Sequence, residues 1–194
     1  MTHTIFGESH GPAIGVVLQD VPPGIPVDEA FLAKELSRRA TGKNALSTAR
    51  READEVEILS GVFRGRTTGT PLCMVIRNTG QHSGDYAAIR ELARPSHGDL
   101  GGYVRYGGNS DYRGGGHFSG RLTAPLVAAG ALAKLILREK GVTVAAHIAS
   151  IGGIPDAPLD LARPDMEALT ACGEKPFPRS EEHTSELQSL AYLV

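Results

Sequence analysis

The sequence predicts one domain that combines helices with antiparallel strands, on three observations. Residues 56–62 and 72–76 are apolar runs joined by a Gly-rich turn, which favours a hairpin. Residues 26–40 begin with Pro and Asp and carry the apolar spacing of an amphipathic helix. Residues 121–140 are rich in Ala and Leu and end at Gly141, which predicts the longest helix. A chain of 194 residues, 41% hydrophobic, can bury one such core.

The other elements are predicted in chain order from shorter signals. They are a strand over 14–18, a polar loop over 41–55, a short helix over 85–93, a strand over 142–148 and a short helix over 164–172.

The helix over 26–40 has a buried face and a charged end. We expect Phe31, Leu32 and Leu36 to form the buried face. Arg38 and Arg39 lie at its end, where cations suit the negative end of the helix dipole.

Composition excludes several classes of protein. Cys73 and Cys172 are the two cysteines and lie far apart, which argues against a disulfide framework and a cysteine zinc site. The longest apolar stretch, 122–137, holds Pro125 and Lys134 and is too short to cross a bilayer. We therefore expect a soluble, cytoplasmic protein that does not bind membranes.

Basic residues are concentrated in one part of the chain. Residues 34–121 hold 14 of the 20 Lys and Arg and 9 of the 22 Asp and Glu, a local net charge of +5. Twelve of those 14 cations are Arg, whose fork of donors matches carboxylate and phosphate. A solvated surface is one interpretation and an anionic small molecule is the favoured one. An RNA-binding module is the non-enzyme alternative, although the chain is acidic overall and poor in aromatic residues.

Residues 94–121 contain nine Gly and lead into the helix over 121–140. A Gly-rich loop before a helix N-terminus can present backbone N–H groups to an anion. A plain flexible linker remains the alternative.

Three histidines lie beside Gly: His10, His97 and His117. Such residues can approach a ligand closely and titrate near neutral pH, which suits proton transfer. Ordinary loop hydrogen bonds are the alternative. A zinc site is disfavoured because no His-x-x-x-His spacing occurs. Nucleophilic catalysis by Ser9 is disfavoured because no Gly-x-Ser-x-Gly elbow occurs.

Eight segments, in order over about residues 4–160, together resemble the chorismate synthase family. They are Phe6–Pro12, Val21–Pro26, Arg38–Arg39, Arg50–Asp54, Ser60–Val62, Thr68–Pro71, Arg94–His97 and Asp111–Arg121.

The resemblance implies an α+β fold with helices sandwiched between antiparallel sheets, here incomplete. It implies a carbon–oxygen lyase that eliminates phosphate from 5-enolpyruvylshikimate 3-phosphate to give chorismate. The implied cofactor is reduced FMN, with NADPH as a reductant in some members, and the implied assembly is a homotetramer. No metal and no nucleic acid is implied.

The resemblance also assigns roles to residues. His10 is implied to protonate the departing phosphate, and His97 to balance the charge of the reduced flavin. Cofactor contacts are implied for His117, Phe118, Ser119 and, through NADPH, Arg39. Substrate contacts are implied for Ser9, Arg39, Arg50, Arg51 and Arg121.

The two ends of the chain are interpreted differently. Residues 1–178 are expected to be the N-terminal part of a single chorismate synthase domain, because members of the family are nearly twice as long. Residues 179–194 resemble the translation of a sequencing adapter and are expected to be a non-native tail. An inactive, truncated fragment is therefore an alternative to an active enzyme.

Overall fold

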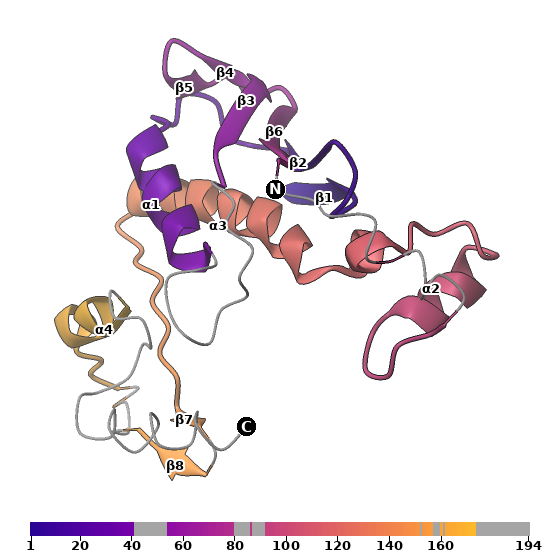
Figure 1. The fold of residues 1–194 in the computed structure, drawn as a ribbon. Helices are drawn as coiled ribbons and strands as arrows, with labels where there is room; N and C mark the ends of the chain where they lie inside the picture. The colour runs from indigo at the N-terminus through magenta and orange to yellow at the C-terminus, as the bar shows by residue number, and fades with distance from the viewer. Residues whose placement is uncertain are drawn as a thin grey trace. The chain divides into compact units, whose positions relative to one another are not determined.

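The computed structural model describes residues 1–40, 54–79, 86, 92–151, 153–156, 160 and 162–173 (Figure 1). The chain divides into two compact units, one of residues 1–43 with 48–142 and one of residues 44–47 with 143–194. All of the described candidate site residues belong to the first unit. The loop expected over 41–55 and the helix expected over 85–93 lie almost entirely outside the described residues, and the tail expected over 179–194 lies wholly outside them.

The first unit is built on a four-stranded antiparallel sheet with the strand order β1-β2-β6-β3. Its strands are β1 (Thr2–Gly7), β2 (Ala13–Gln19), β3 (Val56–Ser60) and β6 (Leu72–Arg77). The predicted strand over 14–18 and the predicted pairing of 56–62 with 72–76 are confirmed. Ile14, Val16 and Leu18 point to one face of β2 and are fully buried, as the two-residue period of a strand requires.

Along the chain, a small hairpin of β4 (Val62–Phe63) and β5 (Arg66–Thr67) connects β3 to β6. The strand expected over 56–62 is therefore interrupted at Gly61. The φ angle of Gly61 is +85°, and a Cβ there would lie 2.4 Å from the Leu72 Cα, so only glycine fits this bend.

Two helices pack together and close the core of the first unit: α1 (Glu29–Arg39) and α3 (Thr123–Arg138). Figure 1 shows α3 lying along one face of the sheet with α1 beside it. Ala124, Ala128 and Ala131 are buried on α3, and these small side chains allow the helix to approach its neighbours closely. Both predicted helices are confirmed, and Asp28 caps α1 by accepting a 2.9 Å hydrogen bond from the Phe31 N–H.

The Gly-rich stretch 94–121 is more ordered than the sequence indicated. It contains α2 (Asp99–Arg105) and the short 3-10 helices η2 (Arg113–Phe118) and η3 (Gly120–Leu122). A Cβ at Gly98 or Gly102 would lie 2.9 or 2.6 Å from the Phe118 ring. The glycines therefore let this ring pack against α2, and that tertiary contact outweighs their low helix propensity.

The second unit contains the hairpin of β7 (Ser150–Ile151) and β8 (Ile154–Pro155), and the helix α4 (Met166–Gly173). The helix predicted over 164–172 is confirmed. The strand predicted over 142–148 is wrong, because residues 142–149 are irregular and pair with no strand among the described residues. An apolar alternation forms a strand only where a partner strand receives its backbone hydrogen bonds.

By length and composition, one described segment, Arg113–Arg138, could cross a membrane. It is not one continuous helix, because Gly114–Gly116 have non-helical backbone angles. The α-helical part, α3, has 16 residues and a length of about 24 Å. That is shorter than a hydrocarbon core of about 30 Å. Half of the most apolar 18-residue stretch of this segment is also buried inside the fold.

Candidate active site

The turn between β1 and β2 carries Ser9 and His10 and is held against η2. Ser9 is fully buried, and its N–H donates to the Gly116 carbonyl at 3.1 Å. The Ser9 Oγ donates to the Gly114 carbonyl, also at 3.1 Å. His10 is 6% exposed. The fold thus brings Ser9 and His10, which the sequence placed in one motif, against the Gly-rich segment more than 100 residues away.

Gly114 makes room for the His10 imidazole. Its φ angle is +58°, and a Cβ there would lie 2.3 Å from the His10 Cδ2 and 2.8 Å from the Ser9 Oγ. Any other residue would therefore be strained in its backbone and would overlap the ring. Gly114 therefore lets the backbone of η2 lie close to His10. The sequence had suggested that this segment approaches an anion.

Two neighbours set the environment of His10. The Tyr86 ring meets it edge to face with centroids 5.1 Å apart. Asp111 lies near enough for the charge of His10 to contribute to lowering the pKa of that carboxyl, although the hydrogen bond from Arg113 is the largest cause. The contact with Tyr86 and the close approach of the Gly114 backbone restrict the position of the imidazole.

A buried ion cluster lies next to this turn, and we call Asp54, Arg39, Arg121 and Asn78 the Asp54 cluster. The Asp54 side chain is 2% exposed, and its two oxygens pair with Arg39 and with Arg121. The Arg39 Nε also donates to the Thr123 Oγ1 at 3.0 Å. The Arg121 Nε donates to the Asn78 Oδ1 at 3.1 Å. Two cations, one carboxylate and one neutral amide give the cluster a net charge of +1.

Asp54 is a residue that the sequence reasoning missed. The resemblance placed Arg39 and Arg121 on anionic ligands, and the structure gives both of them an internal carboxylate partner. Asp54 ends the segment Arg50–Asp54, one of the eight that carry the resemblance, but nothing in that segment marks it as the partner of Arg39 and Arg121. Arg50 and Arg51 themselves lie outside the described residues.

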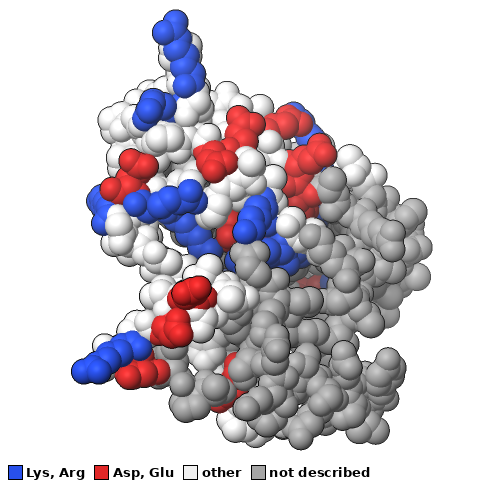
Figure 2. Space-filling view, turned by 90° about the vertical axis from the view of Figure 1, so that its left-hand side faces the viewer, with Lys and Arg blue, Asp and Glu red and all other residues white. Residues whose placement is uncertain are grey.

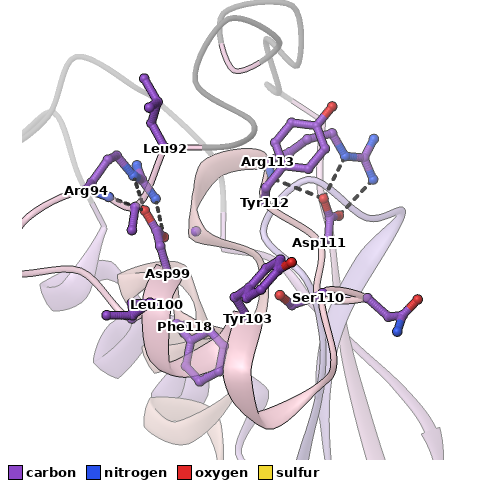
Figure 3. A pocket seen from close by; sticks show the side chains of 15 residues that line it. Leu92, Arg94, Asp99, Leu100, Tyr103, Ser110, Asp111, Tyr112, Arg113 and Phe118 are labelled. Carbon is purple, nitrogen blue, oxygen red and sulfur yellow. Dashed lines mark hydrogen bonds and ion pairs between the residues drawn. The ribbon is translucent and has the colours of Figure 1, made fainter.

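A hollow of about 900 Å³ lies over α2 and the start of η2 (Figure 3). Tyr103, Tyr112 and Phe118 line it together with two ion pairs. In the first pair the Arg94 Nε and Nη2 donate to Asp99 at 2.8 and 2.9 Å. In the second pair the Arg113 Nε and Nη2 donate to Asp111 at 2.9 and 2.8 Å.

The Arg94 guanidinium lowers the pKa of Asp99 to about 2, chiefly through its hydrogen bonds. Both carboxylates in the hollow are therefore ionised at neutral pH. The two pairs cancel in charge, so the hollow is polar at its rim without a net charge.

The residues predicted to contact the cofactor are distributed over different surroundings. Phe118 lines the hollow. The Nδ1 of His117 lies 2.9 Å from the Gly7 carbonyl and so ties η2 to the end of β1. Ser119 caps η3 by accepting a 3.3 Å hydrogen bond from the Arg121 N–H. His97 is exposed, with its Nδ1 3.0 Å from the Pro95 carbonyl.

The described residues contain no group of three His, Cys, Asp or Glu arranged for a metal ion. The groups that the described residues provide at the site are hydrogen-bond donors, cations and a buried imidazole.

Comparison with known proteins decides the family. The sequence model of the chorismate synthase family matches residues 1–189. The chain belongs to the chorismate synthase family. This match confirms the resemblance found in the sequence motifs. Chorismate synthases are lyases of aromatic biosynthesis. The boundary at residue 178 and the individual site assignments stay predictions.

Several chorismate synthases are close relatives of this chain. The protein of Aeropyrum pernix is 57% identical over 151 residues, which is 78% of this chain and 40% of that protein. The protein of Nitratiruptor sp. is 55% identical over 151 residues, which is 78% of this chain and 42% of that protein. The chain thus spans about two fifths of the length of these curated relatives.

A solved structure of a chorismate synthase has the same fold over this part. It superposes with a TM-score of 0.66 at 29% identity and covers 100% of this chain and 52% of that chain. The predicted class, α+β with antiparallel sheets and incomplete relative to the family, is confirmed.

Proposed function

We propose that this chain supplies part of the active site of a chorismate synthase. The reaction is elimination of phosphate from 5-enolpyruvylshikimate 3-phosphate to give chorismate. The observation that carries the proposal is the joining of the buried Ser9–His10 turn to the Asp54 cluster in one unit. A proton donor beside fixed cations suits the departure of a phosphate group. The NADPH contact at Arg39, the homotetramer and the cytoplasmic location remain predictions.

His10 is proposed to give the proton that the departing phosphate requires. It is almost fully buried, and the Gly114 backbone and the Tyr86 ring lie against it. Such packing excludes water and holds the imidazole in one orientation, so little reorganisation is needed when the proton is transferred.

Arg39 and Arg121 are proposed to stabilise the negative charge of the substrate. Asp54 holds both guanidinium groups close together and cancels half of their charge, which leaves a net +1. In a buried site this charge acts at lower dielectric than on the surface. Asp54 thus keeps two cations in place that would otherwise repel each other.

The residues present fit the ring system of a flavin. Ligand sites commonly measure about 300–1,000 Å³ and are lined by aromatic and apolar groups, and the hollow in Figure 3 has about 900 Å³ with Tyr103 and Phe118 on its wall. Its ion pairs are internally neutral, which suits an aromatic ring better than a phosphate. Reduced FMN, when bound, supplies electron density that assists cleavage of the carbon–oxygen bond. His97 is proposed to balance the charge of the reduced ring.

No specific observation favours the RNA-binding alternative. On the face in Figure 2, basic and acidic side chains are intermixed, without a broad basic surface among the described residues shown there. Several arginines already pair with carboxylates of this chain, namely Arg39, Arg77, Arg94, Arg113 and Arg121. Paired arginines release fewer counterions on binding RNA.

The proposal is tested by joining residues 1–160 to the remaining length of the Aeropyrum pernix chorismate synthase. Phosphate release from 5-enolpyruvylshikimate 3-phosphate is then measured under anaerobic conditions, with and without reduced FMN. We expect release that depends on the flavin and is unaffected by a chelator. Flavin-independent release, or salt-dependent RNA binding without turnover, would contradict the assignment.

In the same chimera, His10→Ala and His97→Ala are each expected to lower turnover by about 10²–10⁴, the usual contribution of acid–base help. The exposed His3 on β1 offers a matched control, and His3→Ala should leave turnover unchanged. Losses below about threefold for both variants would favour ordinary loop hydrogen bonds over proton transfer.

A further inference from the structure

We infer that Asn78 is the positioning residue that couples the His10 turn to the Asp54 cluster. The inference rests on the proposed function in one respect, the role given to His10. Asn78 directly follows β6, and its neighbour Arg77 makes the last pair of the β2–β6 ladder with Ala13. It therefore lies at the end of the sheet, where a side chain can serve the site without holding the strands together.

The side chain of Asn78 bonds to the turn and to the cluster at once. Its Nδ2 donates to the Glu8 carbonyl at 3.0 Å and to the Gly11 carbonyl at 2.9 Å. Its Oδ1 accepts the 3.1 Å hydrogen bond from the Arg121 Nε. The Asn78 N–H adds a third bond to the turn, to the Pro12 carbonyl at 3.2 Å. Because Asn78 is only 8% exposed, water competes little for the hydrogen-bonding groups of its side chain.

The chemistry of these partners requires an amide at this position. Two carbonyl oxygens require two donor hydrogens, and a guanidinium requires an acceptor. A reversed amide would place oxygen against both carbonyls and NH₂ against the Arg121 cation. An aspartate has the same shape and could accept from Arg121, but it would present negative oxygen to the Glu8 and Gly11 carbonyls. Asn78 is thus fixed in one orientation.

The turn is therefore held on two sides. On one side Asn78 holds the carbonyls of Glu8, Gly11 and Pro12. On the other side the Ser9 backbone and hydroxyl bond to η2. His10 lies between these anchors, so release of the Asn78 side lets the imidazole leave its place beside Gly114 and Tyr86. The β2–β6 pairing, such as Ile14 with Ile76, does not depend on the amide.

Asn78→Asp in the full chain tests the inference without an activity assay, so its result is independent of the proposed function. Nuclear magnetic resonance measures the contact of the His10 ring with Tyr86 and hydrogen exchange at the Ser9 N–H. We expect the His10–Tyr86 contact to be lost and Ser9 exchange to rise by about tenfold or more. Exchange in the β2–β6 ladder should stay unchanged.

Asn109→Asp is the matched control. The Asn109 Nδ2 also donates to two carbonyls of a turn, those of Tyr106 at 3.1 Å and Gly107 at 3.0 Å, but this turn is exposed. The control should leave the signals of His10 and Ser9 unchanged. Asn78→Ser, which removes the amide without adding charge, should repeat the effect of Asn78→Asp.

Unchanged His10 and Ser9 signals in the Asn78 variants would overturn the inference. Equal effects of the Asn109 variant would also overturn it, because the loss would then not be specific to this amide. Unfolding of both Asn78 variants would overturn it as well, since Asn78 would then hold the whole sheet instead of the turn.

Discussion

Two regions of the first unit use arginine–aspartate pairs in opposite ways. In the Asp54 cluster, Asp54 pairs with Arg39 and Arg121, 15 and 67 residues away, and the carboxylate is buried. In residues 92–118, which we call the outer segment, Arg94 pairs with Asp99 and Arg113 with Asp111, five and two residues apart. The first arrangement exists only once the domain is folded, whereas the second forms locally.

The difference separates two tasks. Local pairs pre-shape the wall of the hollow and cancel their own charge, which leaves a neutral surface. The long-range cluster gathers cations from separate elements around one carboxylate and keeps a net positive charge. We therefore expect changes in the cluster to affect the whole fold and changes in the outer segment to stay local.

Asp54→Asn is expected to have the largest effect on stability. It removes the buried carboxylate that pairs with both arginines, and breaking a buried ion pair by removing one partner typically costs about 3–5 kcal/mol. Asp111→Asn, in the partly exposed local pair, should cost about 1 kcal/mol or less. Denaturant unfolding measures the loss in free energy of unfolding for both variants. Equal losses would contradict the difference between the two regions.

Gly114→Ala is expected to cost about 1–3 kcal/mol, because the added methyl overlaps His10 and the backbone has a positive φ. Gly130→Ala is the matched control, since Gly130 lies within α3 and a Cβ there meets nothing within 4 Å. That change should stabilise the protein by up to about 1 kcal/mol, because alanine favours helix. Thermal unfolding measures whether each variant is less or more stable than the parent protein. A Gly114→Ala variant of unchanged stability would mean that His10 is not held as described.

Inorganic phosphate is expected to restore part of the stability lost in Asp54→Asn. The variant leaves two clustered guanidinium groups that an anion can bridge. Binding would contribute about 1.4 kcal/mol when phosphate is at ten times its dissociation constant. Unfolding in phosphate and in chloride of equal ionic strength separates specific binding from screening, and equal effects of the two salts would argue against a bridging anion.

Asp99→Asn is expected to have the smallest effect, a small loss of stability at neutral pH that disappears at low pH. The pKa of Asp99 is lowered from 3.8 to about 2, so its pairing stabilises the fold above pH 3.8 and is lost as pH falls toward 2. The variant should lack the part of the acid slope that Asp99 contributes in that window. Carboxyl titration by nuclear magnetic resonance checks the value directly. An Asp99 that titrates near 3.8 would show that the local pair does not persist in solution.

The sequence predicted the elements whose signals are local. The strand β2, and the helices α1, α3 and α4, have uninterrupted apolar patterns or clear caps. The strand β1 went unnoticed because its sequence, THTIFG, is half polar and its pairing with β2 supplies the stability. The helix α2 went unnoticed because its glycines disfavour a helix until Phe118 packs against them.

The site was predictable only as separate motifs. The family resemblance singled out Ser9, His10, Arg39 and Arg121, and the fold places them in one unit. It could not indicate Asp54 or Asn78 as the residues that join these motifs, because their partners lie as far as 70 residues away in the chain. Pairings of that kind depend on the tertiary structure and leave no periodic signal in a single sequence.

Calorimetric titration of FMN, oxidised and reduced, into residues 1–194 tests most directly whether this chain holds one part of a larger flavin and substrate site. Each arginine of the hollow is already paired with an aspartate, so the FMN phosphate gains little there. We predict no saturation at about 100 μM FMN, which corresponds to a binding free energy weaker than about −5.5 kcal/mol. Micromolar binding together with cooperative unfolding would show that these residues form a complete flavin site and would contradict the prediction.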